Sequence, residues 1–349
     1  MLKKTAVLMM VIVVLGCLIN TNALAAKPFR IAWSHYTGWE PWEFARNSGI
    51  IDKWAKKYGI EIELELVNDY IESINLYTGG TYHGCVMTNM DALTIPAVGG
   101  IDSTALIIGD FSNGNDGIVM KNGSSVADLK GREIKLVELS VSHYLLAQAL
   151  SKNGLKEKDL QIINTSDADI ASLFAADANA AVVTWNPMLL QCRNAKGANL
   201  VFDSAKIPGE IIDMMVVRTG TPETLKKALV GAWYETMAVM SAKDKKAKEA
   251  IQYMAKFAGG TEAEFKAQLR TTQMFYNAAD AADFANSSKL KETMEFVRKF
   301  CFDHGLYGDA DTVDFVGIQF PDQKVIGDKA NIKLRFDVQY MQMAADGKL

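Results

Sequence analysis

Residues 29–42 read FRIAWSHYTGWEPW and open the stretch that decides the fold. Residues 29–33 predict a first strand, and Pro41 is a residue type favoured at the first position of a helix. Residues 61–67 alternate charged and apolar side chains, which is typical of a half-buried strand. The next elements are predicted to be a helix at 71–77 and strands at 82–87 and 105–109. This strand–helix rhythm predicts a parallel sheet flanked by helices.

The same rhythm restarts after residue 130 and predicts a second α/β module. Its elements are expected to be strands at 133–137, 160–163 and 180–183, with helices at 141–153 and 170–176 between them. Residues 214–217 predict a returning strand. Beyond Pro222 the chain is mainly helical, with runs at 224–240, 246–257 and 289–300.

The second module is inserted within the first, which predicts two lobes joined by two chain crossings. We expect the crossings near residues 112–116 and 217–220, which are polar and contain glycine, as hinges often do. One lobe is predicted to comprise residues 27–113 and 218–349, and the other residues 114–217.

The first 26 residues predict an export signal. Lys3 and Lys4 precede an apolar run at 6–16, and small residues at 23–26 provide a cleavage site near Ala25 or Ala26. The run is shorter than the roughly 20 residues that span a bilayer. An alternative is that Val-Leu-Gly-Cys at 14–17 acts as a lipobox and that Cys17 carries a lipid anchor.

The composition is that of an ordinary globular protein. The 349 residues are 49% hydrophobic and 22% charged, a length that suggests about two domains. The net charge of −4, without a basic stripe, makes nucleic acid a poor partner. Beyond Cys17 the cysteines are Cys85, Cys192 and Cys301, which imply no disulfide framework, although a pairing of the last two stays open.

Ligands of open α/β sheets bind at the carboxyl ends of the strands. Aromatic, amide and carboxylate side chains gather after the predicted strands, in segments 34–42, 68–70, 88–91, 109–113, 138–143, 184–187 and 209–213. From these segments we select ten candidate ligand-binding residues: Trp39, Trp42, Asp69, Asn89, Asp91, Glu138, Ser140, Trp185, Glu210 and Asp213.

None of these strand-end segments contains lysine or arginine, although the chain has 37 of them. An anion site would recruit such cations, whereas carboxylates beside tryptophan suit a small planar cation or a neutral, amide-rich solute. Trp39 and Trp42 could instead be packing residues, and Asp69, Asp91 and Asp110 could cap helices or turns. An anion site also stays open at residues 140–142, where a helix N-terminus would present free N–H groups.

Enzyme signatures are scarce. The four histidines, His35, His83, His143 and His304, form no metal-binding spacing, and Ser140 near His143 is only a weak hint of a nucleophile. We therefore expect a protein that is not an enzyme, with no catalytic residues, no metal and no cofactor.

The strand FRIAWS followed by GWEP resembles the periplasmic solute-binding proteins of ABC importers, in the nitrate, sulfonate, taurine and thiamine-precursor class. The amino-acid sequences at residues 87–93 and 183–187 are similar to those of that class. Residues 39–42 and 109–116 resemble the subgroup associated with urea carboxylases, for which urea or guanidine is the implied cargo.

This resemblance implies the two-lobed α/β periplasmic-binding-protein fold (type II), with two crossings between the lobes and C-terminal helices. It also implies a monomer in the periplasm that captures guanidinium or urea in the cleft between its lobes and delivers it to an ABC permease and ATPase in the inner membrane. The alternatives are a binding protein for a small anion such as nitrate, sulfonate or taurine, a pyrimidine-precursor-binding or synthase-like protein, and a sensor subunit without transport.

Overall fold

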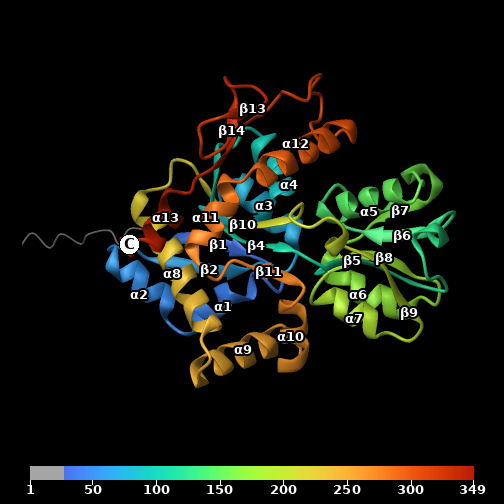
Figure 1. The fold of residues 1–349 in the computed structure, drawn as a ribbon, viewed down its shortest axis with the longest axis horizontal. Helices are drawn as coiled ribbons and strands as arrows, with labels where there is room; N and C mark the ends of the chain where they lie inside the picture. The colour runs from blue at the N-terminus through green and yellow to red at the C-terminus, as the bar shows by residue number, and fades with distance from the viewer. Residues whose placement is uncertain (1–26) are drawn as a thin grey trace, which may run out of the picture.

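The computed structural model describes residues 27–349, so the predicted signal segment and Cys17 lie outside the described residues. The described chain contains two β-sheets with helices packed around them (Figure 1). The larger sheet has the strand order β13-β12-β14-β4-β10-β3-β1-β2, with β11 paired to β4, and the smaller has the order β7-β6-β8-β5-β9. The predicted α/β class with two modules is confirmed.

The strands of the larger sheet come from both ends of the described chain. They are β1 (Phe29–Trp33), β2 (Ile62–Leu66), β3 (Gly84–Thr88), β4 (Ser103–Ser112), β10 (Ile212–Arg218), β11 (Thr272–Met274), β12 (Gly317–Gln319), β13 (Val325–Ile326) and β14 (Ile332–Phe336). The smaller sheet contains β5 (Asp116–Lys121), β6 (Glu133–Leu136), β7 (Gln161–Asn164), β8 (Ala181–Trp185) and β9 (Ala198–Asp203).

Both sheets are mixed rather than purely parallel. In the larger sheet β1 pairs in parallel with β2 and β3, but β10 lies antiparallel between β3 and β4. In the smaller sheet β5 lies antiparallel between β8 and β9. These two strands are the ones that follow the crossings between the sheets. The chain passes from β4 to β5 through residues 113–115, and returns from β9 to β10 through residues 204–211.

The position of β10 differs from the prediction. The predicted lobe boundary after residue 217 and the predicted crossing at 217–220 would place this strand with the second module. Because β10 pairs with β3 and β4 along its length, it belongs to the larger sheet, and the return crossing precedes it. The sequence pattern identifies the strand but not its partners.

The helices begin and end close to the sequence signals. They are α1 (Glu40–Asn47), α2 (Ile50–Lys57), α3 (Tyr70–Thr78), α4 (Asn89–Ala92), α5 (Val141–Lys152), α6 (Asp167–Ala176), α7 (Met188–Asn194), α8 (Glu223–Ser241), α9 (Lys245–Phe257), α10 (Glu262–Leu269), α11 (Ala278–Asn286), α12 (Ser288–Asp303) and α13 (Gln339–Ala345). Pro41 lies in the first turn of α1, and Asp69 and Ser140 cap α3 and α5 by accepting hydrogen bonds from backbone N–H groups.

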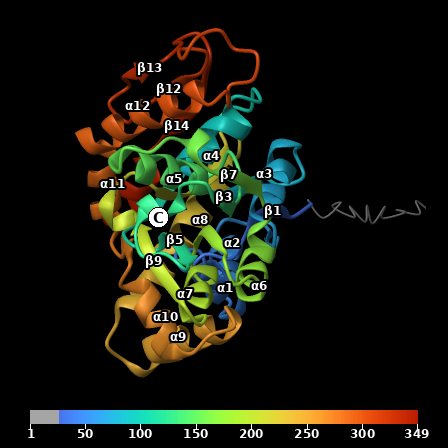
Figure 2. The ribbon, with the colours of Figure 1, turned by 90° about the vertical axis from the view of Figure 1, so that its right-hand side faces the viewer.

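The helices of the smaller sheet, α5, α6 and α7, pack on β8. Figure 2 shows α5 above β5 and β9 of this sheet and α6 and α7 below them. Around the larger sheet, α3 packs on β1 and β3, and α8 and α11 pack on β4. The buried apolar residues of both sheets form one core cluster, in which β3 and β8 are buried along their whole length.

The remaining predictions about the described residues concern cysteine and membrane insertion. Cys85, Cys192 and Cys301 are buried free thiols, so the possible pairing of the last two is not present. None of the helices in residues 27–349 combines the length and apolar character needed to cross a membrane.

Candidate functional site

Strand register brings acidic residues from both crossings together. Asp213 at the start of β10 pairs on one side with Asp110 of β4 and on the other with Thr88 at the end of β3. In the smaller sheet, Asp116 at the start of β5 pairs with Trp185 at the end of β8. The crossing segments lead directly into β5 and β10. The paired residues of the larger sheet and those of the smaller sheet therefore lie beside the space between the two sheets.

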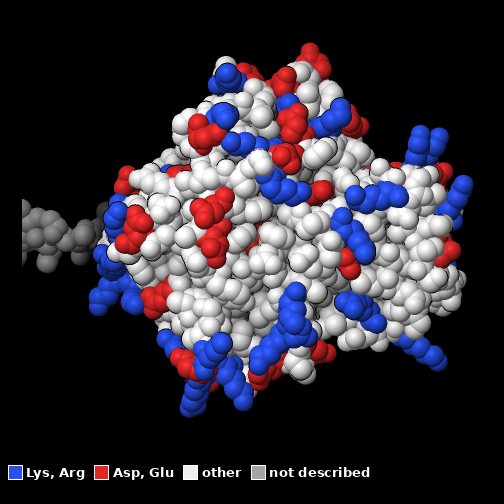
Figure 3. All heavy atoms as spheres, in the orientation of Figure 1, with Lys and Arg blue, Asp and Glu red and all other residues white. Residues whose placement is uncertain are grey.

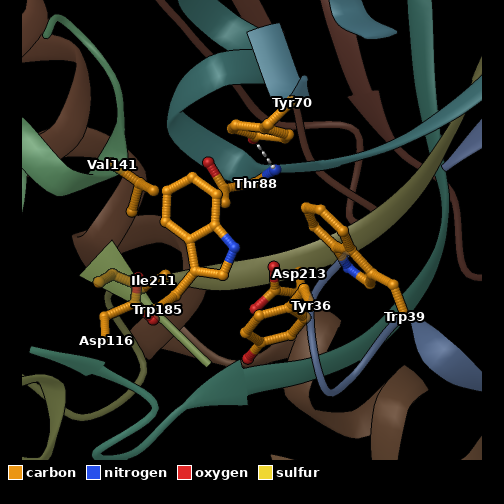
Figure 4. Close-up of a pocket in the computed structure, with 9 residues that line it drawn as sticks. All are labelled: Tyr36, Trp39, Tyr70, Thr88, Asp116, Val141, Trp185, Ile211 and Asp213. Carbon is orange, nitrogen blue, oxygen red and sulfur yellow. Dashed lines mark hydrogen bonds between the residues drawn. The ribbon is translucent and has the colours of Figure 1, made fainter. Parts of the chain in front are cut away.

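A pocket of about 230 Å³ free of protein atoms lies at this position. Figure 4 shows Trp39 and Trp185 on opposite sides of it, with Tyr36 and Asp213 on its wall. The residues that line it are Tyr36, Trp39, Tyr70, Thr88, Asp116, Val141, Trp185, Ile211 and Asp213. Neither lysine, arginine nor histidine is among them.

The aromatic walls form a continuous cluster. The ring centroid of Trp39 lies 5.0 Å from that of Tyr36 and 5.5 Å from that of Tyr70. Tyr70 in turn meets Trp185 edge to face at 5.5 Å. The Trp185 indole N–H donates to the His35 backbone carbonyl across the two sheets, at 3.0 Å. Rings from both sides of the structure therefore line the pocket.

Asp110 and Asp213 form a close acidic pair. Their side chains lie within hydrogen-bonding reach of each other, and both are almost fully buried. The Tyr36 hydroxyl donates to Asp110 Oδ1 at 2.9 Å. Burial raises the pKa of both carboxyls, and the charge of Asp110 raises the pKa of Asp213 further. Gly38 is required beside the pair, because a Cβ there would collide with Asp110.

Asp116 is the acidic residue that the smaller sheet contributes to the pocket. It is 2% exposed, and its Oδ2 has no hydrogen-bond partner among the described residues. Burial raises its pKa to about 7. A buried carboxyl without a partner is unfavourable unless a ligand or a proton satisfies it.

A third acidic group lies behind the aromatic wall. Asp91 accepts hydrogen bonds from the Tyr70 hydroxyl at 2.6 Å and from the Thr88 hydroxyl at 2.8 Å. Burial raises its pKa to about 6, and hydrogen bonds from Tyr70, Thr88 and the backbone N–H of Val141 work against that rise. Asp91 thus fixes the Tyr70 ring, and it faces the N-terminus of α5.

Three of the ten residues selected from the sequence line the pocket, namely Trp39, Trp185 and Asp213. Asn89 and Glu210 support its floor. Asn89 donates to the Glu210 carbonyl and accepts from the Ile212 N–H, which fastens the start of β10. The Glu210 carboxylate accepts from the Tyr144 hydroxyl of α5 at 2.6 Å.

Two of the remaining candidates have capping roles. Ser140 is buried and accepts from the Ser142 N–H. Asp69 accepts from the Glu72 N–H and, through its other oxygen, from the Ser166 hydroxyl of the smaller lobe.

The last two candidates lie away from the pocket. Trp42 packs on Trp233 of α8, with ring centroids 4.9 Å apart. Glu138 is exposed, next to Leu139, which has a positive φ of 62° that turns the chain before α5.

The sequence-based selection omitted Tyr36, Tyr70, Asp110 and Asp116. Tyr36, Tyr70 and Asp110 belong to strand-end segments that the sequence does single out, at 34–42, 68–70 and 109–113. Asp116 begins a strand instead of following one, so a search for carboxyl ends of strands passes over it.

Polar contacts hold the two halves of the structure together around the pocket. The Tyr70 N–H donates to Asp167 Oδ1 at 3.2 Å. On the far side of α5, His304 Nε2 lies 2.8 Å from Glu157 Oε1, while its Nδ1 lies 2.8 Å from the Phe300 carbonyl. Because both ring nitrogens of His304 face acceptors, the imidazolium form is favoured. The Glu157 hydrogen bond raises the pKa of His304.

The described residues contain no group of three or more His, Cys, Asp or Glu side chains arranged to hold a metal ion. The charged groups on the surface are of both signs, and Figure 3 shows them interspersed over the face drawn. Carboxyl groups without basic neighbours therefore cluster in the pocket, whereas acidic and basic side chains are mixed on that face.

Comparison with known proteins gives a partial family match. A family model described as NMT1/THI5 like matches residues 54–209. A Brucella abortus (strain 2308) protein provisionally named a binding protein is 29% identical over 165 residues, which cover 46% of this chain and 49% of that protein. The same figures hold for a Brucella melitensis protein with the same kind of name. The chain thus matches about half the length of these relatives.

Solved structures match over a larger part of the chain. The alkanesulfonate-binding protein SsuA from Xanthomonas axonopodis pv. citri, bound to MOPS, matches with a TM-score of 0.65 and 16% identity, over 82% of this chain and 96% of that one. The periplasmic nitrate-binding protein NrtA from Synechocystis PCC 6803 matches with a TM-score of 0.57 and 12% identity, over 92% and 98%.

A third match is a Candida albicans protein described as having the generic periplasmic binding protein fold, with a TM-score of 0.61 and 13% identity over 82% of this chain and 93% of that one. These likenesses establish that the chain has the periplasmic-binding-protein fold, as predicted.

Proposed function

We propose that this chain is the solute-binding component of an ABC importer, and that its pocket captures a small nitrogen-rich solute, guanidinium first and urea second. The fold, the NMT1/THI5-like match and the similarity to proteins named for binding support the class. The chemistry of the pocket supports the solute.

The observation that carries the proposal is the set of buried carboxyls without a basic partner. Asp110, Asp116 and Asp213 are each at most 2% exposed, and the residues that line the pocket include no lysine or arginine. Ionised carboxylates only accept hydrogen bonds. A solute that brings both N–H donors and a positive charge satisfies them, and in a water-poor site the attraction is stronger than in water.

The shape of the pocket also favours a small planar cation. Within it, the centre of a water-sized sphere can reach only about 10 Å³, far below the roughly 300–1,000 Å³ typical of pockets for drug-sized ligands. Trp39 and Trp185 lie on opposite sides of it. Guanidinium would contact these rings through cation–π interactions while its N–H groups meet the carboxyls at the edge. Urea has a similar outline but no charge, so it would bind best to a protonated carboxyl.

The anion alternative has support of its own, because SsuA and NrtA are named for binding sulfonate and nitrate. The candidate anion site at the N-terminus of α5 is faced by the Asp91 carboxyl. An anion there would meet that carboxyl and the unpaired Asp116 nearby. The pocket chemistry therefore favours a cation over nitrate, sulfonate or taurine.

The pyrimidine-precursor or synthase-like alternative draws on the family match at residues 54–209. Such an enzyme would place a histidine or cysteine at its ligand, whereas the residues lining this pocket include neither. A turnover assay in which the solute is recovered unchanged supports a binding protein.

The proposal includes the cellular setting implied by the sequence. The mature protein would be an exported monomer in the periplasm, starting after the signal at residues 1–26, and its partners would be a permease and an ATPase of the inner membrane. A permease and an ATPase encoded alongside would separate import from ligand sensing.

The proposed lobes are the two predicted ones, with the return boundary moved from residue 217 to the start of β10 because of the pairing of that strand: residues 27–113 and 212–349 against residues 114–211. Closure of these lobes around the solute would bring Asp116 and Trp185 onto Trp39 and Asp213.

A thermal-shift panel tests the proposal. Guanidinium, urea, nitrate, taurine and a pyrimidine would each be added to the mature protein. A ligand at 100 times its Kd stabilises the folded state by about 2.7 kcal/mol. Guanidinium should raise the melting temperature, and the absence of a shift with guanidinium and urea, together with a shift from nitrate or taurine, would reject the proposed solute.

A further inference from the structure

Without a ligand, the two neighbouring carboxyls of Asp110 and Asp213 lack a positive charge to neutralise them. Asp110 and Asp213 occupy opposed positions on β4 and β10 and lie within hydrogen-bonding reach of each other. Two ionised carboxylates at that separation repel each other, so a buried site strongly disfavours the ionisation of both in the absence of a cation. The Tyr36 hydroxyl supplies one hydrogen bond, to Asp110 Oδ1. A proton held between the two carboxyls is therefore needed to join them.

The surroundings of the pair offer no other neutralising charge. The titratable groups that act on Asp110 and Asp213 are Tyr36, Asp116 and Tyr276, and Asp116 is itself acted on by Asp91. Tyr36 is buried and holds its proton, since its pKa is raised well above the ordinary value by burial. Within residues 27–349, no lysine, arginine or histidine lines the pocket or is among the groups that act on these two carboxyls, so a proton is the cation that can neutralise the pair when no solute is bound.

We propose that the pocket is a cation–proton exchanger: without a solute the Asp110–Asp213 pair stores a proton, and a bound cation displaces it. The proton leaves the pair for bulk water as the cation takes its place, so the charge of the pocket is conserved. This inference rests on the proposed function, because it assumes that the solute is a small cation.

Exchange makes capture depend on pH. Burial also raises the pKa of Asp116 to about 7, so the whole cluster holds protons more tightly than free carboxyls do. Below its pKa the cluster must give up a proton to bind a cation, and each exchanged proton should raise the apparent affinity about tenfold per pH unit until the cluster is already ionised. A neutral solute such as urea displaces no proton and gains nothing from rising pH.

Calorimetric titration with guanidinium chloride tests the inference. The titration is run near pH 6 in phosphate and in ACES, whose ionisation enthalpies differ, so that the difference in heat gives the number of protons released. We expect at least one proton near pH 6, and an affinity that increases with pH for as long as protons are released.

Variants assign the exchange to the pair. Asp213→Asn should release fewer protons than wild type, and its guanidinium affinity should depend less steeply on pH. Asp116→Asn should bind more weakly than wild type but still release a proton, because it leaves the pair intact. Asp283→Asn, on an exposed part of α11, should behave as wild type. Thermal unfolding of each variant reports whether it is folded, and the wild-type titration stands without them.

The outcomes separate the inference from the function beneath it. Saturable guanidinium binding without proton release in wild type would overturn the exchange while keeping the cation-binding function. Unchanged proton release in a folded Asp213→Asn variant would also overturn it. Failure of guanidinium to bind at any pH, with binding of nitrate or taurine, would overturn the proposed solute and the exchange together.

Discussion

Replacement of Asp116 by asparagine should separate ligand binding from stability, because its two effects have opposite signs. Asp116 is buried, its Oδ2 has no partner among the described residues, and it lies opposite Trp185 in the smaller sheet. Asparagine keeps the shape and removes the charge. We expect the variant to lose affinity for guanidinium and to gain stability without it.

The two magnitudes follow from burial. Loss of one partner of a buried, hydrogen-bonded charge pair costs about 2–5 kcal/mol, or a roughly 30- to 4,000-fold loss of affinity. Burial raises the pKa of Asp116 from 3.8 to about 7. At about 1.36 kcal/mol per pKa unit, ionising it in the folded protein costs roughly 4 kcal/mol, as an upper bound.

The sign of the stability effect follows from that rise in pKa. The folded protein binds the Asp116 proton more tightly than the unfolded chain does. The stability contribution is fully present below the unfolded pKa of 3.8 and is lost as pH rises through about 7. The asparagine variant avoids this loss, so its advantage over wild type should be largest above pH 7.

Calorimetric titration with guanidinium gives the affinity. Chemical unfolding in urea at low and high pH gives the free energy of unfolding. Because urea is itself a possible ligand, its binding is titrated first. Asp283→Asn removes an exposed carboxylate of α11 and should change neither quantity. Wild-type guanidinium affinity in a folded Asp116→Asn variant would refute the role of this carboxyl.

Three other predictions follow from the same structure. Trp39→Ala should weaken guanidinium binding by about 0.5–2 kcal/mol if the contact is cation–π. Trp185→Ala should weaken binding more, because it also removes the hydrogen bond to His35. Calorimetry measures both affinities, and an unchanged affinity in both variants would count against a role of these two rings in binding. Glu157→Gln should weaken the contact with His304 and reduce ligand affinity by up to about fivefold. That effect should shrink as pH rises through the raised pKa of His304, which the same titration at several pH values would show. Small-angle scattering should give a monomer whose radius decreases on saturation with ligand, and an unchanged radius with proven binding would contradict closure of the lobes.

The alternating strand and helix signals are enough to predict the α/β class and most elements of residues 29–218. Local patterns carry this information, as in β6, expected at 133–137 and found at Glu133–Leu136. The short strands β12, β13 and β14 were missed in a region expected to be helical. β14 pairs with β4, more than 200 residues earlier, and β12 joins the sheet through β14 and β13 through β12. Such short strands have little local signal of their own.

The site was predictable only as far as strand ends reveal it. Trp39, Trp185 and Asp213 were selected because they adjoin predicted strands, and they line the pocket. Asp110 and Asp116 were not selected, because their convergence depends on the antiparallel strands β10 and β5.

The sequence also does not show which of two similar side chains lines the pocket and which packs in the core. Trp42 is near Trp39 in the chain but packs on Trp233, a contact set by the placement of the distant helix α8. The capping role of Asp69, by contrast, is a local property that the sequence does suggest.

The most direct test of the central claim is a calorimetric comparison of guanidinium with nitrate and taurine on the same preparation of mature protein. The buried carboxyls of Asp110, Asp116 and Asp213, without a basic partner in the pocket, predict saturable binding of one guanidinium per chain and no heat of binding from either of the other solutes. Saturable binding of nitrate or taurine, with guanidinium inert, would contradict the account.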